Sequence, residues 1–291
     1  MKNYLKLIRV NQYIKNLFVF APIFFGNQFM NFIALTNVFV AFISFCLAAS
    51  SIYILNDYFD INEDKKHPVK SKRPFASGEI AVKNGLILMV VLAVAAVTIS
   101  LFWSQKLFLV VISYLIINIL YSKWLKHIAI LDVNIIAIGF VLRLIAGTVV
   151  TDILPSIWIL LITYLLALFL GIAKRRSDVI LAQQGQEVRK NIAGYNLVFI
   201  DSILGILSSI IIVCYIFYCI SPEVQLHYKS NLLYVSIIFV INGIFRYLQL
   251  SFVNQSTFSP TKVVLTDKFI QITILGWFIL MSYLLYFQNI E

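Results

Sequence analysis

The sequence predicts an all-α integral membrane protein with about nine transmembrane helices. Hydrophobic residues make up 61% of its 291 residues, only 12% are charged, and the mean hydropathy is +0.91. A soluble domain is about 45–50% apolar and about 25% charged. The composition therefore excludes a disordered chain, an ordinary soluble enzyme and a domain that binds nucleic acid through a solvated basic surface.

Nine apolar runs, separated by polar breaks, come close to the roughly 20 residues that a helix needs to cross the hydrocarbon core. Before the first of them, residues 3–14 alternate apolar and basic side chains, which favours a segment lying along the membrane interface. The expected spans are residues 17–36, 38–58, 82–102, 107–122, 128–150, 156–173, 197–220, 232–252 and 268–287.

The positive charges predict the orientation of these spans. Twenty of the 23 Lys and Arg residues fall on connections that would share one side, whereas only Lys106 and Lys229 fall on the other. Since basic residues accumulate on the cytoplasmic side, the N-terminus is predicted to be cytoplasmic in a multi-pass protein of the cell membrane. The long polar loops, about 59–81 and 174–196, would then both face the cytoplasm, where we expect the functional site.

Acidic residues gather where the second expected span ends. Asp57, Asp60 and Asp64 are spaced i, i+3 and i+7, so on a helix that continues out of the membrane they share one face, with Asn56 at its edge. Carboxylates this close repel one another unless a cation joins them. Mg²⁺ prefers oxygen ligands and is often shared between carboxylates and substrate phosphates. We therefore predict a metal site here; the alternative is a solvated helix end.

A basic stretch follows the acids directly and includes His67, Lys70 and Arg73. Cations beside metal-binding carboxylates suit a substrate that carries phosphate groups. A patch that only attracts the anionic lipid surface is the alternative for the lysines. His67 is equally compatible with an ordinary loop histidine.

Arg143 lies inside the fifth expected span, where a charge is costly and by default indicates a polar cavity. Asp132 is eleven residues earlier, about 16 Å along a helix, so the two cannot pair within it. Arg143 must therefore meet a substrate or a partner on another helix, and a structural ion pair between helices remains the alternative. Gly139 and Gly147 would allow a neighbouring backbone to approach closely.

These residues carry a resemblance to a family. The pattern Asn56-Asp57-x-x-Asp60-x-x-x-Asp64, followed by Arg73-Pro74-x-x-Ser77-Gly78, resembles the first Asp-rich motif of the UbiA-type membrane prenyltransferase superfamily. The resemblance implies a nine-helix UbiA-like bundle, an active site open to the cytoplasm, and Mg²⁺ bound by Asn56, Asp57, Asp60 and Asp64, with Asp57 and Asp60 as catalytic residues. Residues 1–291 would form a single transmembrane catalytic domain.

A narrower resemblance, from residue 9 to about residue 270, is to decaprenyl-phosphate phosphoribosyltransferases. It rests on the stretch from Arg9 to Pro22, His67-Pro68-x-Lys70, Tyr121-Ser122-x-x-Leu125-Lys126, Phe140-Val-Leu-Arg143-x-x-Ala146-Gly147, Lys174-Arg175-Arg176 and Arg246-Tyr247-Leu248. The resemblance implies transfer of 5-phosphoribose from phosphoribosyl pyrophosphate to a polyprenyl phosphate, with pyrophosphate released and the lipid product used in cell-wall biosynthesis. The substrate-binding residues that it implies are Lys15, His67, Lys70, Arg73, Tyr121, Lys126, Arg143, Lys174, Arg175, Asp178 and Arg189.

One difference from the aromatic prenyltransferases favours the resemblance to decaprenyl-phosphate phosphoribosyltransferases. Aromatic prenyltransferases carry a second Asp-rich motif after the sixth helix, but here that region is dominated by basic residues, with Asp178 as its only aspartate. Two phosphorylated substrates with three phosphorylated centres call for more fixed cations and fewer carboxylates. The expected partners are phosphoribosyl pyrophosphate, polyprenyl phosphate and the bilayer, without nucleic acid. The alternatives are transfer of an isoprenoid from its diphosphate to an aromatic acceptor and, more remotely, a membrane transporter.

Overall fold

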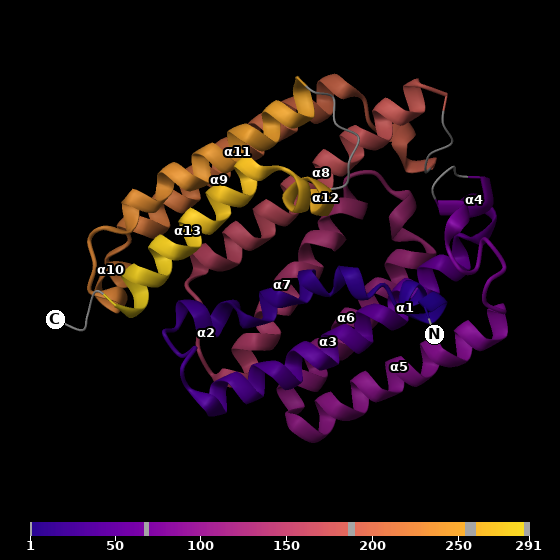
Figure 1. The fold of residues 1–291 in the computed structure, drawn as a ribbon, viewed down its shortest axis with the longest axis horizontal. Coiled ribbons are helices and arrows are strands. Elements are labelled where there is room, and N and C mark those ends of the chain that lie inside the picture. The colour runs from indigo at the N-terminus through magenta and orange to yellow at the C-terminus, as the bar shows by residue number, and fades with distance from the viewer. Residues whose placement is uncertain (1, 67–69, 186–189, 254–259, 288–291) are drawn as a thin grey trace. The chain divides into compact units, whose positions relative to one another are not determined.

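The computed structural model describes residues 2–66, 70–185, 190–253 and 260–287, and every regular element in these ranges is helical. The chain divides into two compact units, Met1–Pro155 and Ser156–Glu291, and each is described by itself (Figure 1). The expectation of a single catalytic domain over residues 1–291 stays a prediction.

The first unit is built around one long central helix, α3 (Phe32–Phe59), which packs against α5, α6, α7 and the 3₁₀ helix η1 (Figure 1). The side chain of Asn31 accepts hydrogen bonds from the backbone N–H groups of Ile33 and Ala34 and so caps the start of α3. The other elements are α1 (Lys2–Leu7), η1 (Val10–Phe20), α2 (Ala21–Phe25), α4 (Ile61–Lys66), η2 (Lys70–Lys72), α5 (Val82–Trp103), α6 (Gln105–Lys123), η3 (Leu125–His127) and α7 (Leu131–Thr151).

The second unit contains four long helices, of which α8 packs on α9 and α11 on α13 (Figure 1). A buried arginine, Arg176 of α8, joins three of its helices: it pairs with Asp201 of α9 at 2.7 Å and donates to the backbone carbonyl of Ser251 in α11. The elements are α8 (Ile157–Gln183), η4 (Lys190–Gly194), α9 (Leu197–Ile220), α10 (Pro222–Tyr228), η5 (Leu233–Ser236), α11 (Ile237–Phe252), α12 (Pro260–Thr266) and α13 (Lys268–Tyr286).

Eight segments in the described part of the chain are helical, long enough and apolar enough to cross a membrane. They are Phe32–Phe59, Val82–Trp103, Gln105–Lys123, Leu131–Thr151, Ile157–Gln183, Leu197–Ile220, Leu233–Phe252 and Lys268–Tyr286. Eight of the nine expected spans therefore have a counterpart, and the protein is all-α and multi-pass. The cytoplasmic position of the N-terminus stays a prediction.

The expected span over residues 17–36 is not one helix, and this prediction is wrong. The chain forms η1 and α2, turns at Gly26 and Asn27, where Asn27 has φ 53°, and starts α3 at Phe32. Apolar residues such as Phe29 and Met30 continue through this turn, so hydropathy alone cannot separate the two segments. At about 2.0 Å rise per residue in η1 and about 1.5 Å in α2, the two together still extend roughly 30 Å.

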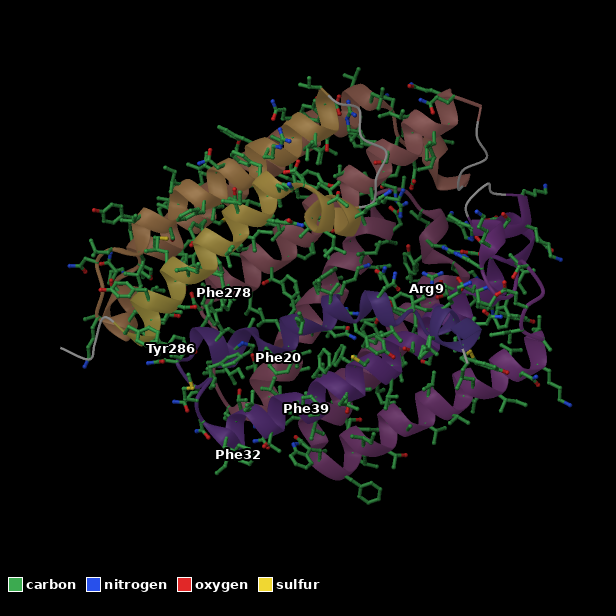
Figure 2. The ribbon with its side chains drawn as sticks, in the orientation of Figure 1. Arg9, Phe20, Phe32, Phe39, Phe278 and Tyr286 are labelled. Atoms are coloured by element: carbon green, nitrogen blue, oxygen red, sulfur yellow. The ribbon has the colours of Figure 1, made fainter. Side chains whose placement is uncertain are left out.

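η1 runs antiparallel to α3 along much of that helix. The pairs that show this, in order of increasing depth from the acidic end of α3, are Arg9 with Asp57, Tyr13 with Ser50, Asn16 with Cys46, and Phe20 with Phe42. Figure 2 labels Arg9 and Phe20 near the two ends of η1. On its other side, η1 presses against α7 at Gly147, where a Cβ atom would lie 2.0 Å from the carbonyl oxygen of Val19. The prediction that Gly147 allows a close backbone approach is confirmed.

A small apolar cluster fixes the chain after α3 onto the end of that helix. Leu7, Ile54, Phe75 and Ile80 are all buried together, and the ring of Phe75 lies so close to Gly85 that a Cβ there would be 2.2 Å away. This packing positions residues 60–66 and 70–81, with their acidic and basic side chains, beside the N-terminal residues of the chain.

The predicted orientation can be tested by thiol labelling. In a variant whose native Cys46, Cys214 and Cys219 are replaced by alanine, a cysteine in place of exposed Lys72 is expected to react with a membrane-impermeant reagent only after the cytoplasmic side is opened. A cysteine in place of exposed Glu223 in α10 should react in intact cells. Reversed labelling would overturn the orientation.

Candidate active site

Three carboxylates at the end of α3 each meet a cation from another segment of the first unit. Asp57 and Asp64 have side chains only 2% and 3% exposed, and the Nη1 atom of Arg73 lies 3.0 Å from Asp57 Oδ1 and 2.7 Å from Asp64 Oδ2. Asp60 pairs with Lys126 of η3, which is itself buried. The predicted residues Asp57, Asp60, Asp64, Arg73 and Lys126 are thus brought together in one ionic cluster.

Arg9 also belongs to this cluster, although it was not among the predicted site residues. Its guanidinium pairs with Asp57 and lies over the ring of Tyr53, 5.1 Å from the centroid. Arg9 has a left-handed backbone conformation, φ 54°, at the junction of α1 and η1, and this turn directs the chain back along α3. Burial lowers the pKa of Arg9, and the charge of Asp57 acts in the opposite direction. The sequence offered one signal for this role: Arg9 is a basic residue that lies six positions before the predicted site residue Lys15.

The cluster is electrically balanced. Three carboxylates from α3, its C-cap and α4 face three cations, Arg9, Arg73 and Lys126, and for this ionic cluster the formal charges cancel. Buried charges are stable only when they are paired in this way. The same balance determines what the cluster can bind. A metal cation alone would meet carboxylates that the three basic side chains already neutralise. A metal cation that arrives with an anion gives the carboxylates a cation to bind and the basic side chains an anion to bind.

The donor set fits a hard metal ion in its chemistry. Carboxylate oxygens of Asp57 and Asp64 converge on one cationic atom, Arg73 Nη1, and Mg²⁺ prefers such oxygens. Within the described residues, no group of three or more His, Cys, Asp or Glu side chains is arranged to hold a metal ion. Asn56 precedes Asp57 in the last turn of α3 and is half-buried. The role of these four residues in metal binding stays a prediction.

The acids were expected to share one continuous helix, but they do not. α3 ends at Phe59, Asp60 is its C-cap with φ −94° and ψ 4°, and α4 starts at Ile61. The bend at Asp60 directs its carboxylate to Lys126, while Asp57 and Asp64 both contact Arg73. The spacing correctly predicted that the acids gather, but it could not predict this division between two cations.

Arg143 of α7 is buried, 4% exposed, and is held by neutral groups. Its Nε donates to Asn16 Oδ1 at 2.7 Å, its Nη1 to the Gly139 carbonyl at 2.6 Å, and its Nη2 to the Tyr114 hydroxyl at 3.1 Å. The rings of Phe45, Tyr114 and Phe140 surround the guanidinium at 5.0–5.6 Å. No carboxylate pairs with Arg143 among the residues that the structure describes, so the alternative of an ion pair between helices is not what is observed.

Lys15, the residue before Asn16 in η1, is half-buried and has no hydrogen bond or ion pair with any described residue. Lys15 and Arg143 are thus two cations of the first unit that form no ion pair with a described carboxylate.

Two predicted basic residues of the second unit, Lys174 and Arg175, lie on a helix rather than in a loop. The expected loop over residues 174–196 is wrong in its first part, because α8 continues to Gln183, and apolar residues such as Val179 and Ile180 stay buried beyond the charges. Asp178 accepts hydrogen bonds from Lys174 at 2.7 Å and from Arg175 at 2.8 Å. The one acid of α8 thus contacts two predicted cations.

The remaining predicted residues are less defined by the structure. Tyr121 is buried near the end of α6, and Lys70 begins η2 and is half-buried. His67 and Arg189 lie outside the described residues. Sequence reasoning missed the contribution of Asn16 and Tyr114, which hold Arg143; uncharged side chains inside apolar runs give no signal of their own.

Comparison with known proteins places this chain in a family. The sequence matches the UbiA prenyltransferase family over residues 19–272. A protein of Mycolicibacterium smegmatis named decaprenyl-phosphate phosphoribosyltransferase is 32% identical, covering 98% of this chain and 92% of the relative. A protein of the same name from Mycobacterium tuberculosis is 29% identical, covering 94% of this chain and 90% of the relative.

The fold is also found among solved structures. A UbiA homolog from Archaeoglobus fulgidus, solved bound to DMAPP and Mg²⁺, has a TM-score of 0.71 over 96% of this chain and 99% of its own, at 20% identity. At that identity the likeness establishes the fold alone. Taken with the family match over most of the sequence, these comparisons show that the chain belongs to the UbiA prenyltransferase family and is a membrane-spanning transferase.

Proposed function

We propose that this transferase moves the 5-phosphoribosyl group of phosphoribosyl pyrophosphate to a polyprenyl phosphate at the cytoplasmic face of the cell membrane, with Mg²⁺ as cofactor. The observation that carries the proposal is the balanced cluster at the end of α3, in which Asp57, Asp60 and Asp64 meet Arg9, Arg73 and Lys126. A site with both sets of charges suits a metal–pyrophosphate group. The relatives named decaprenyl-phosphate phosphoribosyltransferase support this choice of substrates.

In the proposed reaction, an oxygen of the lipid phosphate attacks the anomeric carbon of the ribose. The new carbon–oxygen bond forms as the bond to pyrophosphate breaks, and pyrophosphate leaves with that electron pair. Asp57, Asp60, Asp64 and Asn56 would hold the metal, which stabilises the negative charge of the leaving group when bound. Arg73, Arg9 and Lys126 would bind phosphate oxygens, as guanidinium and ammonium groups do.

No general base is required in this reaction. A phosphate monoester already carries about −1.5 to −2 charge at pH 7, so the nucleophile is ionised before it arrives. This agrees with the cluster, in which the described titratable groups are carboxylates and cations already engaged in ion pairs.

The alternative within the family is transfer of an isoprenoid from its diphosphate to an aromatic acceptor, which would also expel pyrophosphate from the same acids. The basic character of α8 favours the phosphorylated sugar, because Lys174 and Arg175 share the single acid Asp178. A transporter, the more remote alternative, gains no support from the family to which the chain belongs.

The decisive assay uses membranes that contain the protein, radiolabelled phosphoribosyl pyrophosphate and polyprenyl phosphate. We expect label in the organic phase only when Mg²⁺ and the lipid are both present. Label transferred instead from a prenyl diphosphate to an aromatic acid, with phosphoribosyl pyrophosphate ignored, would refute the proposed substrates while leaving the acidic cluster with the same role.

Replacing Arg175 by Gln is expected to raise the Michaelis constant for phosphoribosyl pyrophosphate by roughly 10- to 150-fold, the equivalent of one charged hydrogen bond of ~1.5–3 kcal/mol. The reason is that a guanidinium binds phosphate through two parallel hydrogen bonds, which an amide cannot reproduce. Steady-state kinetics with each substrate varied in turn would measure it. The constant for polyprenyl phosphate should move less, and if neither constant moves, Arg175 only anchors α8.

A further inference from the structure

Arg9 of the ionic cluster has an unusual backbone conformation for an arginine. It follows the end of α1 with φ 54° and ψ 52°, in the left-handed region (Figure 2). Glycine usually takes this position at the end of a helix, because a residue with a Cβ atom is unfavourable there. Such a conformation persists only when the surrounding structure fixes it. The contacts that fix Arg9 therefore show how its side chain is positioned.

Ser50 of α3 holds the backbone at this turn. Its side chain is fully buried, and its Oγ donates to the carbonyl oxygen of Ile8, the residue before Arg9, at 2.9 Å. The carbonyl groups at the end of α1 have no partner within that helix, so this bond satisfies one of them. Because the serine hydroxyl has a single proton, the Tyr13 hydroxyl, 2.9 Å from Ser50 Oγ, is the donor to it. The two bonds fix the chain on both sides of Arg9.

The other two serines of α3 behave differently from Ser50. Serine hydroxyls inside helices usually bond to a carbonyl group of their own helix. Ser44 donates to the carbonyl of Val40 at 2.9 Å, and Ser51 to that of Ala48 at 2.8 Å. Ser50 instead reaches across to the segment that carries Arg9. Its hydroxyl group therefore has a specific role at the junction of α1 and η1.

Tyr53 and Asp57 of α3 hold the side chain of Arg9. The guanidinium carbon lies 5.1 Å from the centroid of the Tyr53 ring, and the guanidinium pairs with the Asp57 carboxylate. Ser50, Tyr53 and Asp57 are spaced i, i+3 and i+7, so they lie on one face of α3. This face of α3 thus fixes the backbone beside Arg9, the plane of its guanidinium and its charge.

We propose that Ser50 and Tyr53 are positioning residues, which keep Arg9 in place for a phosphate oxygen when a metal–pyrophosphate group takes Asp57 from it. This inference deepens the proposed function and rests on it for the role of Arg9. A metal that binds Asp57 ends the ion pair with Arg9, whereas the contacts with Ser50 and Tyr53 involve no carboxylate and remain. An arginine that is already oriented loses less freedom on binding its ligand, which strengthens binding.

The test is a double-mutant cycle on the binding of radiolabelled pyrophosphate to the purified protein in the presence of Mg²⁺. We expect Arg9→Gln to weaken binding about 10-fold or more, as loss of a charged hydrogen bond does, and Ser50→Ala about 3- to 10-fold, as loss of a neutral one does. In the Arg9→Gln background, Ser50→Ala should weaken binding hardly further, because it acts through Arg9. Ser51→Ala, which removes the neighbouring buried hydroxyl, is the matched control and should bind like the wild type.

An undiminished effect of Ser50→Ala in the Arg9→Gln background would overturn the proposal, because the serine would then act independently of Arg9. Unchanged binding in Ser50→Ala or in Arg9→Gln would overturn it as well, and the second result would also remove Arg9 from the phosphate ligands.

If Ser50→Ala does not fold, Tyr53 decides. Tyr53→Leu should weaken pyrophosphate binding about 2- to 5-fold through loss of the cation–π contact, and Tyr53→Phe, which keeps the ring, should bind like the wild type. Equal binding by the two variants would overturn the proposal. Both transfer reactions considered for the family expel pyrophosphate, so an assay that refutes phosphoribosyl pyrophosphate as the donor would leave these outcomes interpretable.

Discussion

Replacing Asp57 by Asn is expected to lower transferase turnover by about 10²-fold or more, the usual cost of removing a preorganised charge-stabilising group. Asp57 is the most connected carboxylate of the cluster, with ion pairs to both Arg9 and Arg73. The amide keeps the shape of the side chain but not its charge, so it can no longer bind a hard cation well or balance the two guanidinium groups. Asp60→Asn should have an effect of the same order, because it leaves Lys126 buried without its counter-ion.

Three controls make this result specific. Asp152→Asn removes a carboxylate that is 82% exposed and paired with Lys106, and it should leave turnover unchanged. Thermal unfolding in detergent would show whether Asp57→Asn still folds. EDTA should abolish the activity of the wild type and added Mg²⁺ should restore it. Full activity in EDTA, or a variant as active as the wild type, would contradict the role given to the cluster.

The helical plan could be predicted from the sequence because membrane spans follow from hydropathy over long windows. The expected runs at 82–102 and 197–220 correspond to helices Val82–Trp103 and Leu197–Ile220. The prediction of one span over residues 17–36 failed for a physical reason. The turn at Gly26 and Asn27 lies among apolar residues, so the hydropathy does not fall where the helix ends. The same holds for the end of α8, where charged residues continue a helix beyond its apolar part.

Five of the six members of the ionic cluster, all except Arg9, were predicted as site residues, but their pairing was not. Asp57, Asp60 and Asp64 are close in sequence and their spacing alone brings them together, whereas Lys126 reaches Asp60 across 66 positions. Arg9 and Asn16 depend on η1 running antiparallel to α3, a tertiary arrangement that local periodicity does not encode. The sequence therefore predicted the charges of the site better than the neutral side chains that position them.

Replacing Arg73 by Gln is expected to affect the metal and the substrate in opposite directions. Arg73 Nη1 contacts both Asp57 and Asp64, so it occupies the place where a cation would bind. Without it, Mn²⁺ alone should bind more tightly, by about 10-fold or more, because a unit charge about 4 Å away interacts by roughly 4 kcal/mol at an effective dielectric near 20. The Michaelis constant for phosphoribosyl pyrophosphate should nevertheless rise roughly 10- to 150-fold, since a phosphate ligand is lost.

Electron paramagnetic resonance of Mn²⁺, with and without pyrophosphate, separates these two effects. In the wild type, pyrophosphate should strengthen Mn²⁺ binding strongly, because the anion draws Arg9, Arg73 and Lys126 away from the carboxylates. In Arg73→Gln this synergy should shrink. Lys72→Gln removes the same charge from the neighbouring, exposed position and should alter neither quantity. If Mn²⁺ binding weakens together with substrate binding in Arg73→Gln, then Arg73 acts by holding the segment of residues 60–81 in place, and the cluster is not an exchange site for a metal–pyrophosphate group.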